Sequence, residues 1–185
     1  MLGCIADDFT GAGDAASFLA KSGLRVLLCS GVPARMPAGM DAVVIALKTR
    51  TLPANQAVAE SRTALECLRG AGADRLYIKY CSTFDCAPTG NIGPVCDMAL
   101  AFTGARYTAL CPSLPVNGRT VRAGRLFVNG VPLEQSSMKD HPLTPMWDSR
   151  LSELMRRQSR YPVFTVAAPA EARALAERCP TPFYV

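Results

Sequence analysis

The sequence predicts an α/β protein whose mostly parallel sheet carries helices on both faces. Short apolar segments of strand length, such as residues 2–6 and 42–47, alternate with segments of helical period. Strands that are apolar along their whole length are typical of parallel sheets covered on both sides. An Asn-Gly pair between apolar residues further predicts a β-hairpin excursion from this sheet around residues 119–133.

The first half of the chain is expected to alternate strands with helices. Gly23 is placed to end the first helix in the left-handed conformation, and Pro53 is placed to open the second. The predicted strands are 2–6, 25–29, 42–47 and 76–79, and the predicted helices are 14–22 and 53–69.

The second half continues this rhythm around the hairpin. The predicted helices are 92–102, 149–157 and 169–178, and the predicted strands are 107–111, 163–166 and 182–185. Because the chain stops at the start of the last strand, we expect a truncated polypeptide, and a short natural edge strand is the alternative.

Composition excludes several function classes. The 185 residues are 49% hydrophobic and 19% charged, as in ordinary folded proteins, and the net charge is +5. The arginines are scattered and not gathered into a basic stripe with aromatic platforms, so we expect no nucleic-acid binding. No apolar run approaches the roughly 20 residues of a membrane-spanning helix, and no signal peptide is recognised. A mild positive excess suits an anionic substrate.

The eight cysteines contain no Cys-x-x-Cys pair, and the chain has one histidine, so we predict no metal site. Cysteines within apolar runs, such as Cys29, are typical of small core residues. We interpret the cysteines as reduced thiols of a cytoplasmic protein. A catalytic cysteine is the alternative, although no base occupies an evident partner motif.

The turn from Asp7 to Asp14 follows the first predicted strand, and ligands of open parallel sheets bind at such carboxyl ends. Gly11-Ala12-Gly13 partly matches a dinucleotide fingerprint, but Asp7 and Asp8 oppose a bare pyrophosphate. Paired carboxylates suit substrate hydroxyls, a metal or proton transfer. The alternative is that Asp14 or Thr10 merely caps the helix.

Three further polar segments follow predicted strands. Lys48-Thr49-Arg50 offers two cations for a carboxylate, or it is a surface loop. The loop Lys79–Gly93 combines a lysine, hydroxyls and a helix start as an anion-binding nest, with Asn91 as a plain N-cap in the alternative. His141 lies in a loop stiffened by two prolines, and a structural role is the alternative there.

Together these segments resemble the four-carbon acid sugar kinases, and in particular their 3-oxo-tetronate branch. The likeness spans nearly the whole chain and is carried by Ile5–Asp14, Lys79–Asp85, Pro88–Gly93, Pro115–Thr120 and His141–Met146. The resemblance implies transfer of the γ-phosphoryl group of ATP to the terminal hydroxyl of a four-carbon sugar acid. It also implies two domains, of which residues 1–185 would be the sugar-acid-binding one. The C-terminal domain, which would bind most of Mg-ATP, is expected to be absent from this chain.

Residue chemistry and the resemblance together suggest roles for ten residues. Asp7 and Asp8 are the candidate catalytic residues, which accept hydrogen bonds from substrate hydroxyls and orient the attacking one. Arg50 and Lys79 are expected to hold the substrate carboxylate. The remaining substrate contacts are expected from Thr10, Ser82, Thr83, Asn91, His141 and Thr144.

The sequence departs from the family pattern at Trp147 and Cys86, beside the proposed loops.

Two other functions stay open. One is a catalytically inactive fragment that binds a sugar acid, and the other is a hydrolase or reductase with a nucleotide on the Gly11-Ala12-Gly13 turn. Nothing in the sequence excludes a homo-oligomer.

Overall fold

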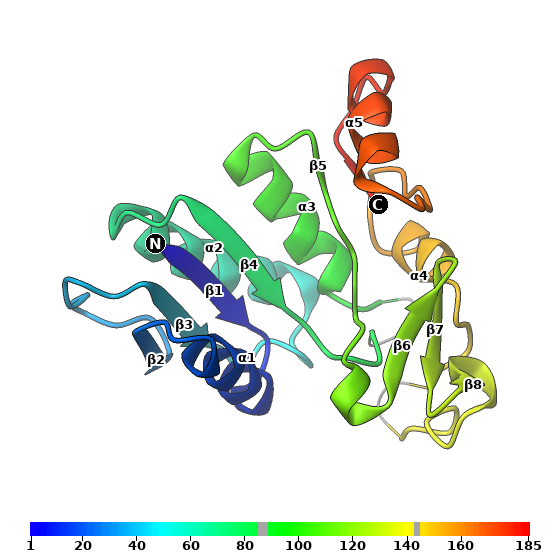
Figure 1. Ribbon diagram of the computed structural model, residues 1–185, viewed down its shortest axis with the longest axis horizontal. Helices are drawn as coiled ribbons and strands as arrows, with labels where there is room; N and C mark the ends of the chain where they lie inside the picture. Colours follow the sequence, from blue (N-terminus) through cyan, green and yellow to red (C-terminus); the bar gives the residue numbers. More distant parts are fainter. Residues whose placement is uncertain (85–88, 143–144) are drawn as a thin grey trace. The chain divides into compact units, whose positions relative to one another are not determined.

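The computed structural model describes residues 1–84, 89–142 and 145–185 (Figure 1). They form two compact units, Met1–Cys81 and Ser82–Val185. The elements of the first unit are β1 (Leu2–Ala6), α1 (Phe9–Lys21), β2 (Val26–Ser30), β3 (Ala42–Ala46), α2 (Ala54–Gly70) and β4 (Arg75–Lys79). Those of the second are α3 (Ile92–Thr103), β5 (Tyr107–Thr108), η1 (Pro115–Asn117), β6 (Arg119–Arg122), β7 (Arg125–Val128), β8 (Val131–Pro132), η2 (Leu133–Gln135), α4 (Leu151–Arg156), α5 (Pro169–Arg178) and β9 (Phe183–Tyr184).

The first unit is built on a four-stranded parallel sheet in the order β2-β3-β1-β4. Strand β1 is therefore flanked by β3 on one side and β4 on the other. Its last residue, Ala6, is in register with Ala46 of β3 and Lys79 of β4. The carboxyl ends of these three strands consequently meet at one edge of the sheet, as expected for the parallel sheet that the apolar segments predicted.

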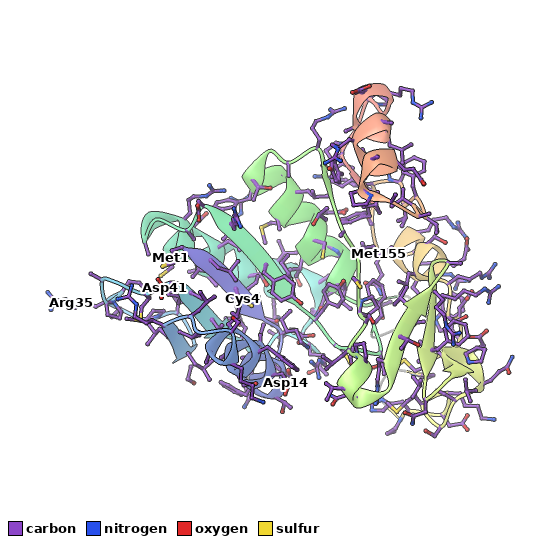
Figure 2. All side chains as sticks on the ribbon, viewed as in Figure 1. Met1, Cys4, Asp14, Arg35, Asp41 and Met155 are labelled. Atoms are coloured by element: carbon purple, nitrogen blue, oxygen red, sulfur yellow. The ribbon has the colours of Figure 1, made fainter. Side chains whose placement is uncertain are left out.

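Helices cover both faces of this sheet, and Figure 1 shows α1 and α2 on opposite sides of it. Cys4 of β1, labelled in Figure 2, belongs to a buried cluster with Ala12 and Ala16 of α1. Side chains alternate along a strand, so the neighbouring Gly3 belongs to the other face. A Cβ at Gly3 would lie 3.2 Å from Cβ of Leu68 on α2. The prediction of helices on both faces is confirmed.

Helix α1 begins earlier than the sequence pattern suggested. It starts at Phe9, and the extended residue Asp8 caps it by accepting a hydrogen bond from the amide of Gly11 at 2.7 Å. The alternative in which Thr10 or Asp14 is the cap is therefore wrong. The predicted helix end is confirmed, because Gly23 follows it with φ of +90°.

The second unit contains the predicted hairpin, extended to three antiparallel strands in the order β6-β7-β8. Asn129 and Gly130 both have positive φ and form the turn between β7 and β8, as expected. A further turn at Ala123 and Gly124 joins β6 to β7. A Cβ at Gly124 would lie 2.6 Å from Oγ1 of Thr165, so glycine is needed there for space as well as for conformation.

Two predicted strands are shorter in the structure. Of the expected 107–111, only Tyr107 and Thr108 are in a strand, β5, which pairs with β9. Of the expected 163–166, only Val163 pairs, through an isolated bridge to Tyr184. Apolar β-branched residues favour strands, but a strand also needs a neighbour along its whole length.

A buried carboxylate on α3 ties distant segments of the second unit together. Asp97 accepts hydrogen bonds from the Ser159 hydroxyl at 2.6 Å, the Arg160 amide at 3.0 Å and the Tyr184 hydroxyl at 2.5 Å. Burial, the nearby Cys96 and the bond to Asp97 raise the pKa of Tyr184, so its hydroxyl remains a donor. The C-terminal strand is thus fixed to α3 by polar bonds inside the core.

Two further properties of the described residues concern membrane spanning and the state of the cysteines. None of their helices has the length and apolar character that crossing a bilayer requires. Their seven cysteines are all free thiols.

Replacement of Tyr184 by Phe removes one donor from the buried Asp97 carboxylate. We expect a loss of about 1–3 kcal/mol in the free energy of unfolding, measured by chemical denaturation. Tyr107→Phe is the matched control in the paired strand β5, because among the described residues the Tyr107 hydroxyl has no hydrogen-bond partner. Equal stability of the two variants would contradict this account of Asp97.

Candidate functional site

The shared register of β1, β3 and β4 brings charged residues to one edge of the sheet. Asp7 and Asp8 directly follow β1, Arg50 follows β3, and Lys79 is the last residue of β4. The Asp7 amide donates to the Lys79 carbonyl at 3.1 Å. The Asp7 carbonyl accepts from the amides of Thr49 at 3.0 Å and Arg50 at 3.2 Å. The main chain at Asp7 is therefore fixed by both neighbouring strand ends.

The Arg50 guanidinium joins the two aspartates. It binds Asp7 through two bonds, Nε to Oδ2 at 3.0 Å and Nη2 to Oδ1 at 2.7 Å. Its Nη1 lies 2.7 Å from Oδ2 of Asp8. Burial lowers the pKa of Arg50, but the bonds and charge of Asp7 outweigh it and raise the pKa overall, so the guanidinium stays charged. Charge-assisted bonds of this kind contribute on the order of 1.5–3 kcal/mol each.

Asp8 has a second task at the start of α1. While Oδ2 faces Arg50, Oδ1 accepts the hydrogen bond from the Gly11 amide. A carboxylate here is favoured by the positive end of the helix dipole as well as by the cap. Both oxygens of Asp8 are thus engaged, and the orientation of its carboxylate is set from two sides.

Gly11 leaves space for the second cation of the site. A Cβ at Gly11 would lie 2.7 Å from Oδ1 of Asp8 and 3.2 Å from Nζ of Lys79. The Lys79 ammonium therefore sits against the first turn of α1, where it donates to the Tyr80 carbonyl at 3.0 Å. A Cβ at Gly13 would meet nothing within 4 Å. The close approach of Lys79 explains the first glycine of the turn without a dinucleotide.

Most of the other predicted site residues belong to the second unit. Thr10 is exposed on the first turn of α1. The second unit contains Ser82, the buried Thr83 and Asn91, and His141, whose amide donates to the Met138 carbonyl. Their membership of the same site stays a prediction. Thr144 and Cys86 lie outside the described residues.

The helix start at Asn91 bears on the interpretation of this residue as a plain N-cap. Asn91 occupies the N-cap position of α3, but its side chain makes no capping hydrogen bond. The Gly93 amide donates to Oε1 of Gln158 at 3.0 Å, so it is not a donor for an external anion. A Cβ at Gly93 would lie 2.6 Å from the Gln158 carbonyl carbon. Close packing against Gln158 accounts for this glycine, and an anion-binding nest is not needed to explain it.

Other chemistries have less support in the described residues. None of their His, Cys, Asp and Glu side chains form a group of three that could hold a metal ion. Burial raises the pKa of Cys4 and of Cys96 to about 12, so neither thiol is ionised near neutral pH. The charged cluster remains, and its carboxylates and ammonium group suit a ligand with hydroxyls and a negative charge.

Three features of the region were missed from the sequence. Asp8 was not recognised as the helix cap, and the contact between Lys79 and Gly11 joins residues on separate elements. The fully buried Phe84, in the part of the predicted binding loop that belongs to the second unit, has φ of +59°. Such strain in a residue with a side chain is held by surrounding structure and is frequent at functional loops. Of these three features, only the helix cap had a signal in the sequence, which is the Asp-x-x-Gly spacing from Asp8 to Gly11.

Curated proteins and solved structures resemble this chain over most of its length. The 3-oxo-tetronate kinase of Brucella melitensis is 53% identical over 160 residues, which are 86% of this chain and 37% of the relative. The chain spans about two fifths of the length of the curated relatives it matches.

Two solved structures are also similar. A Haemophilus influenzae protein superposes with a TM-score of 0.88 at 41% identity, over 99% of this chain and 47% of that one. A Bordetella bronchiseptica protein with bound citrate, described as a domain-swapped dimer, has a TM-score of 0.76 at 35% identity, over 100% and 46%. The family model described as the sugar-binding N-terminal domain matches residues 2–180. The chain therefore belongs to the family of sugar-binding N-terminal domains.

Proposed function

We propose that this chain is the sugar-acid-binding part of an ATP-dependent kinase that converts a 3-oxo-tetronate to its 4-phosphate. The observation that carries the proposal is the pair of aspartates after β1, which binds Arg50 from the loop after β3 and lies at the same sheet edge as Lys79 of β4. The curated relatives named 3-oxo-tetronate kinase support the reaction and the substrate. The family description supports a sugar as the ligand.

The cluster matches the chemistry of a four-carbon acid sugar. Carboxylate oxygens accept hydrogen bonds from hydroxyl groups, which we assign to Asp7 and Asp8. Arg50 and Lys79 supply the positive charge that offsets these two carboxylates, so the four residues together carry no net charge that would repel an incoming sugar acid. Citrate in the Bordetella protein shows that a relative of this fold accepts a hydroxylated carboxylic acid. Thr10, Ser82, Thr83, Asn91, His141 and Thr144 remain our candidates for further substrate contacts.

Phosphoryl transfer relies mainly on positioning and electrostatics. In the proposed reaction, the terminal hydroxyl oxygen of the sugar acid bonds to the γ-phosphorus of ATP, the bond to the ADP oxygen breaks, and the hydroxyl proton passes to an aspartate. Asp7 and Asp8 would orient that hydroxyl. Among the described residues no three His, Cys, Asp or Glu side chains form a group that could hold a metal ion, and two carboxylates precede the glycines of α1, where they oppose the phosphates of a nucleotide. We therefore assign ATP and Mg²⁺ to another part of such a kinase.

Asp8→Asn tests the assignment of the carboxylates. The amide oxygen can still cap Gly11, but the charge that faces Arg50 is lost. We expect about tenfold weaker binding of erythronate or threonate, the size of one charge-assisted hydrogen bond, by calorimetry. Asp14→Asn is the matched control on the same helix, since among the described residues the bond that Asp14 accepts, from the Ser17 hydroxyl, is to its main-chain carbonyl. Unchanged affinity in Asp8→Asn would remove Asp8 from the site.

Gly11→Ala tests the space beside Lys79. The added methyl group would meet both Asp8 Oδ1 and Lys79 Nζ, so one of them must move. We expect sugar-acid affinity to fall about tenfold or more. Gly13→Ala, two residues along the same helix, should leave affinity unchanged and stabilise the protein by about 0.5–1 kcal/mol. Equal affinities of the two variants would show that the Lys79 position is irrelevant to binding.

A binding module without catalysis is the second candidate, because the chain spans about two fifths of the kinases it resembles. An assay of ADP release with 3-oxo-tetronate and ATP separates the two functions. ADP release supports a complete catalytic site, whereas sugar-acid binding without ADP release supports the binding module. Light scattering on the same sample would test self-association, which is described for the Bordetella protein.

A further inference from the structure

We infer that Arg50 is a positioning residue, which holds Asp7 and Asp8 in place, and that Lys79 is the cation that receives the substrate carboxylate. The inference rests on the proposed function and divides the work of the two cations. Both were expected from the sequence to bind the carboxylate. Their surroundings in the structure differ, and this difference separates their roles.

Arg50 already has its guanidinium committed to protein carboxylates. An arginine binds a carboxylate best through two parallel bonds from one edge of the guanidinium. The edge formed by Nε and Nη2 is occupied by Asp7, and Nη1 is occupied by Asp8. The exposed fractions of these side chains are 28% for Arg50, 12% for Asp7 and 28% for Asp8. A substrate carboxylate could form the same two-bond contact with Arg50 only by displacing an aspartate. The displaced aspartate would then be partly buried without a cation partner, which is unfavourable.

Lys79 has a different environment. Among the described residues no carboxylate forms an ion pair with it, and its ammonium donates one bond, to the Tyr80 carbonyl. An ammonium group has three donors. The Lys79 ammonium also lies against the first turn of α1, where the helix dipole favours an anion. The position of Lys79 therefore combines a charge unmatched by an aspartate with the positive end of a helix.

Charge balance leads to the same division. The two aspartates and Arg50 carry a net charge of −1, which repels a carboxylate. Lys79, which approaches Gly11 as Asp8 does, brings the total to zero, so the positive charge that is not paired with an aspartate is at the lysine. We therefore expect the ligand to place its carboxylate at Lys79 and its hydroxyls at the aspartates.

The test compares erythronate with its primary amide, which keeps the hydroxyls and lacks the charge. Lys79→Met should weaken erythronate binding about tenfold or more and leave binding of the amide within about twofold, because only the acid uses the ammonium charge. Arg50→Lys should weaken both ligands to the same extent, since a lysine cannot form the two parallel bonds that hold Asp7 while also reaching Asp8. Calorimetry gives the four affinity changes, and thermal unfolding shows whether each variant is folded.

A ligand-free measurement separates this inference from the proposed function. If Arg50 holds Asp8 in its capping position, Arg50→Lys should speed hydrogen exchange of the Gly11 amide several-fold, whereas Lys79→Met should change it less. Loss of acid binding with retained amide binding in Arg50→Lys, or unchanged Gly11 exchange, would overturn the positioning role. Absence of any sugar-acid binding by the wild-type chain would instead refute the proposed function, and Gly11 exchange would still report on Arg50.

Discussion

The ion cluster of Arg50 with Asp7 and Asp8 is the interaction on which the candidate site depends. Two carboxylates on adjacent residues repel each other, and one partly buried guanidinium offsets that repulsion by binding both. The same contact fixes the turn into α1, because Asp8 is also the helix cap. The end of β1, the loop after β3 and the first turn of α1 are consequently one connected structure.

The parallel register makes this cluster available to a ligand. Since β1 lies between β3 and β4, its carboxyl end is the place where loops from two neighbours converge. The backbone bonds of Asp7 to Lys79, Thr49 and Arg50 hold the three strand ends together. Carboxylates that are fixed in this way can orient a hydroxyl without first being ordered by the ligand, which lowers the entropic cost of binding.

Glycines in the two predicted binding loops have separate physical origins. Gly11 is required by the approach of Lys79 and Asp8, whereas Gly93 is required by the backbone of Gln158. Both lie near a helix start, so a sequence pattern alone assigns them the same phosphate-binding meaning. In the structure the first borders the charged cluster and the second serves packing within the second unit. A glycine near a helix start is therefore evidence of a ligand only when its surroundings are known.

The sequence by itself determined the alternation of elements, and tertiary structure decided which residues meet. Continuous apolar runs located β1 and β3, because a strand buried on both faces leaves no other pattern. The start of α1 was misplaced since Phe9, Thr10 and Gly11 show no helical period, and the predicted strand 163–166 kept one bridge because pairing depends on a partner elsewhere in the chain. The candidate site followed the same division. Their positions after predicted strands identified Asp7, Asp8, Arg50 and Lys79 as candidate site residues. Arg50 and Asp7 are 43 residues apart in the chain, so the sequence does not indicate whether Arg50 binds a substrate or Asp7. Only the register of β1 with β3 decides that contact, because hydrogen bonding depends on distance in space and not along the sequence.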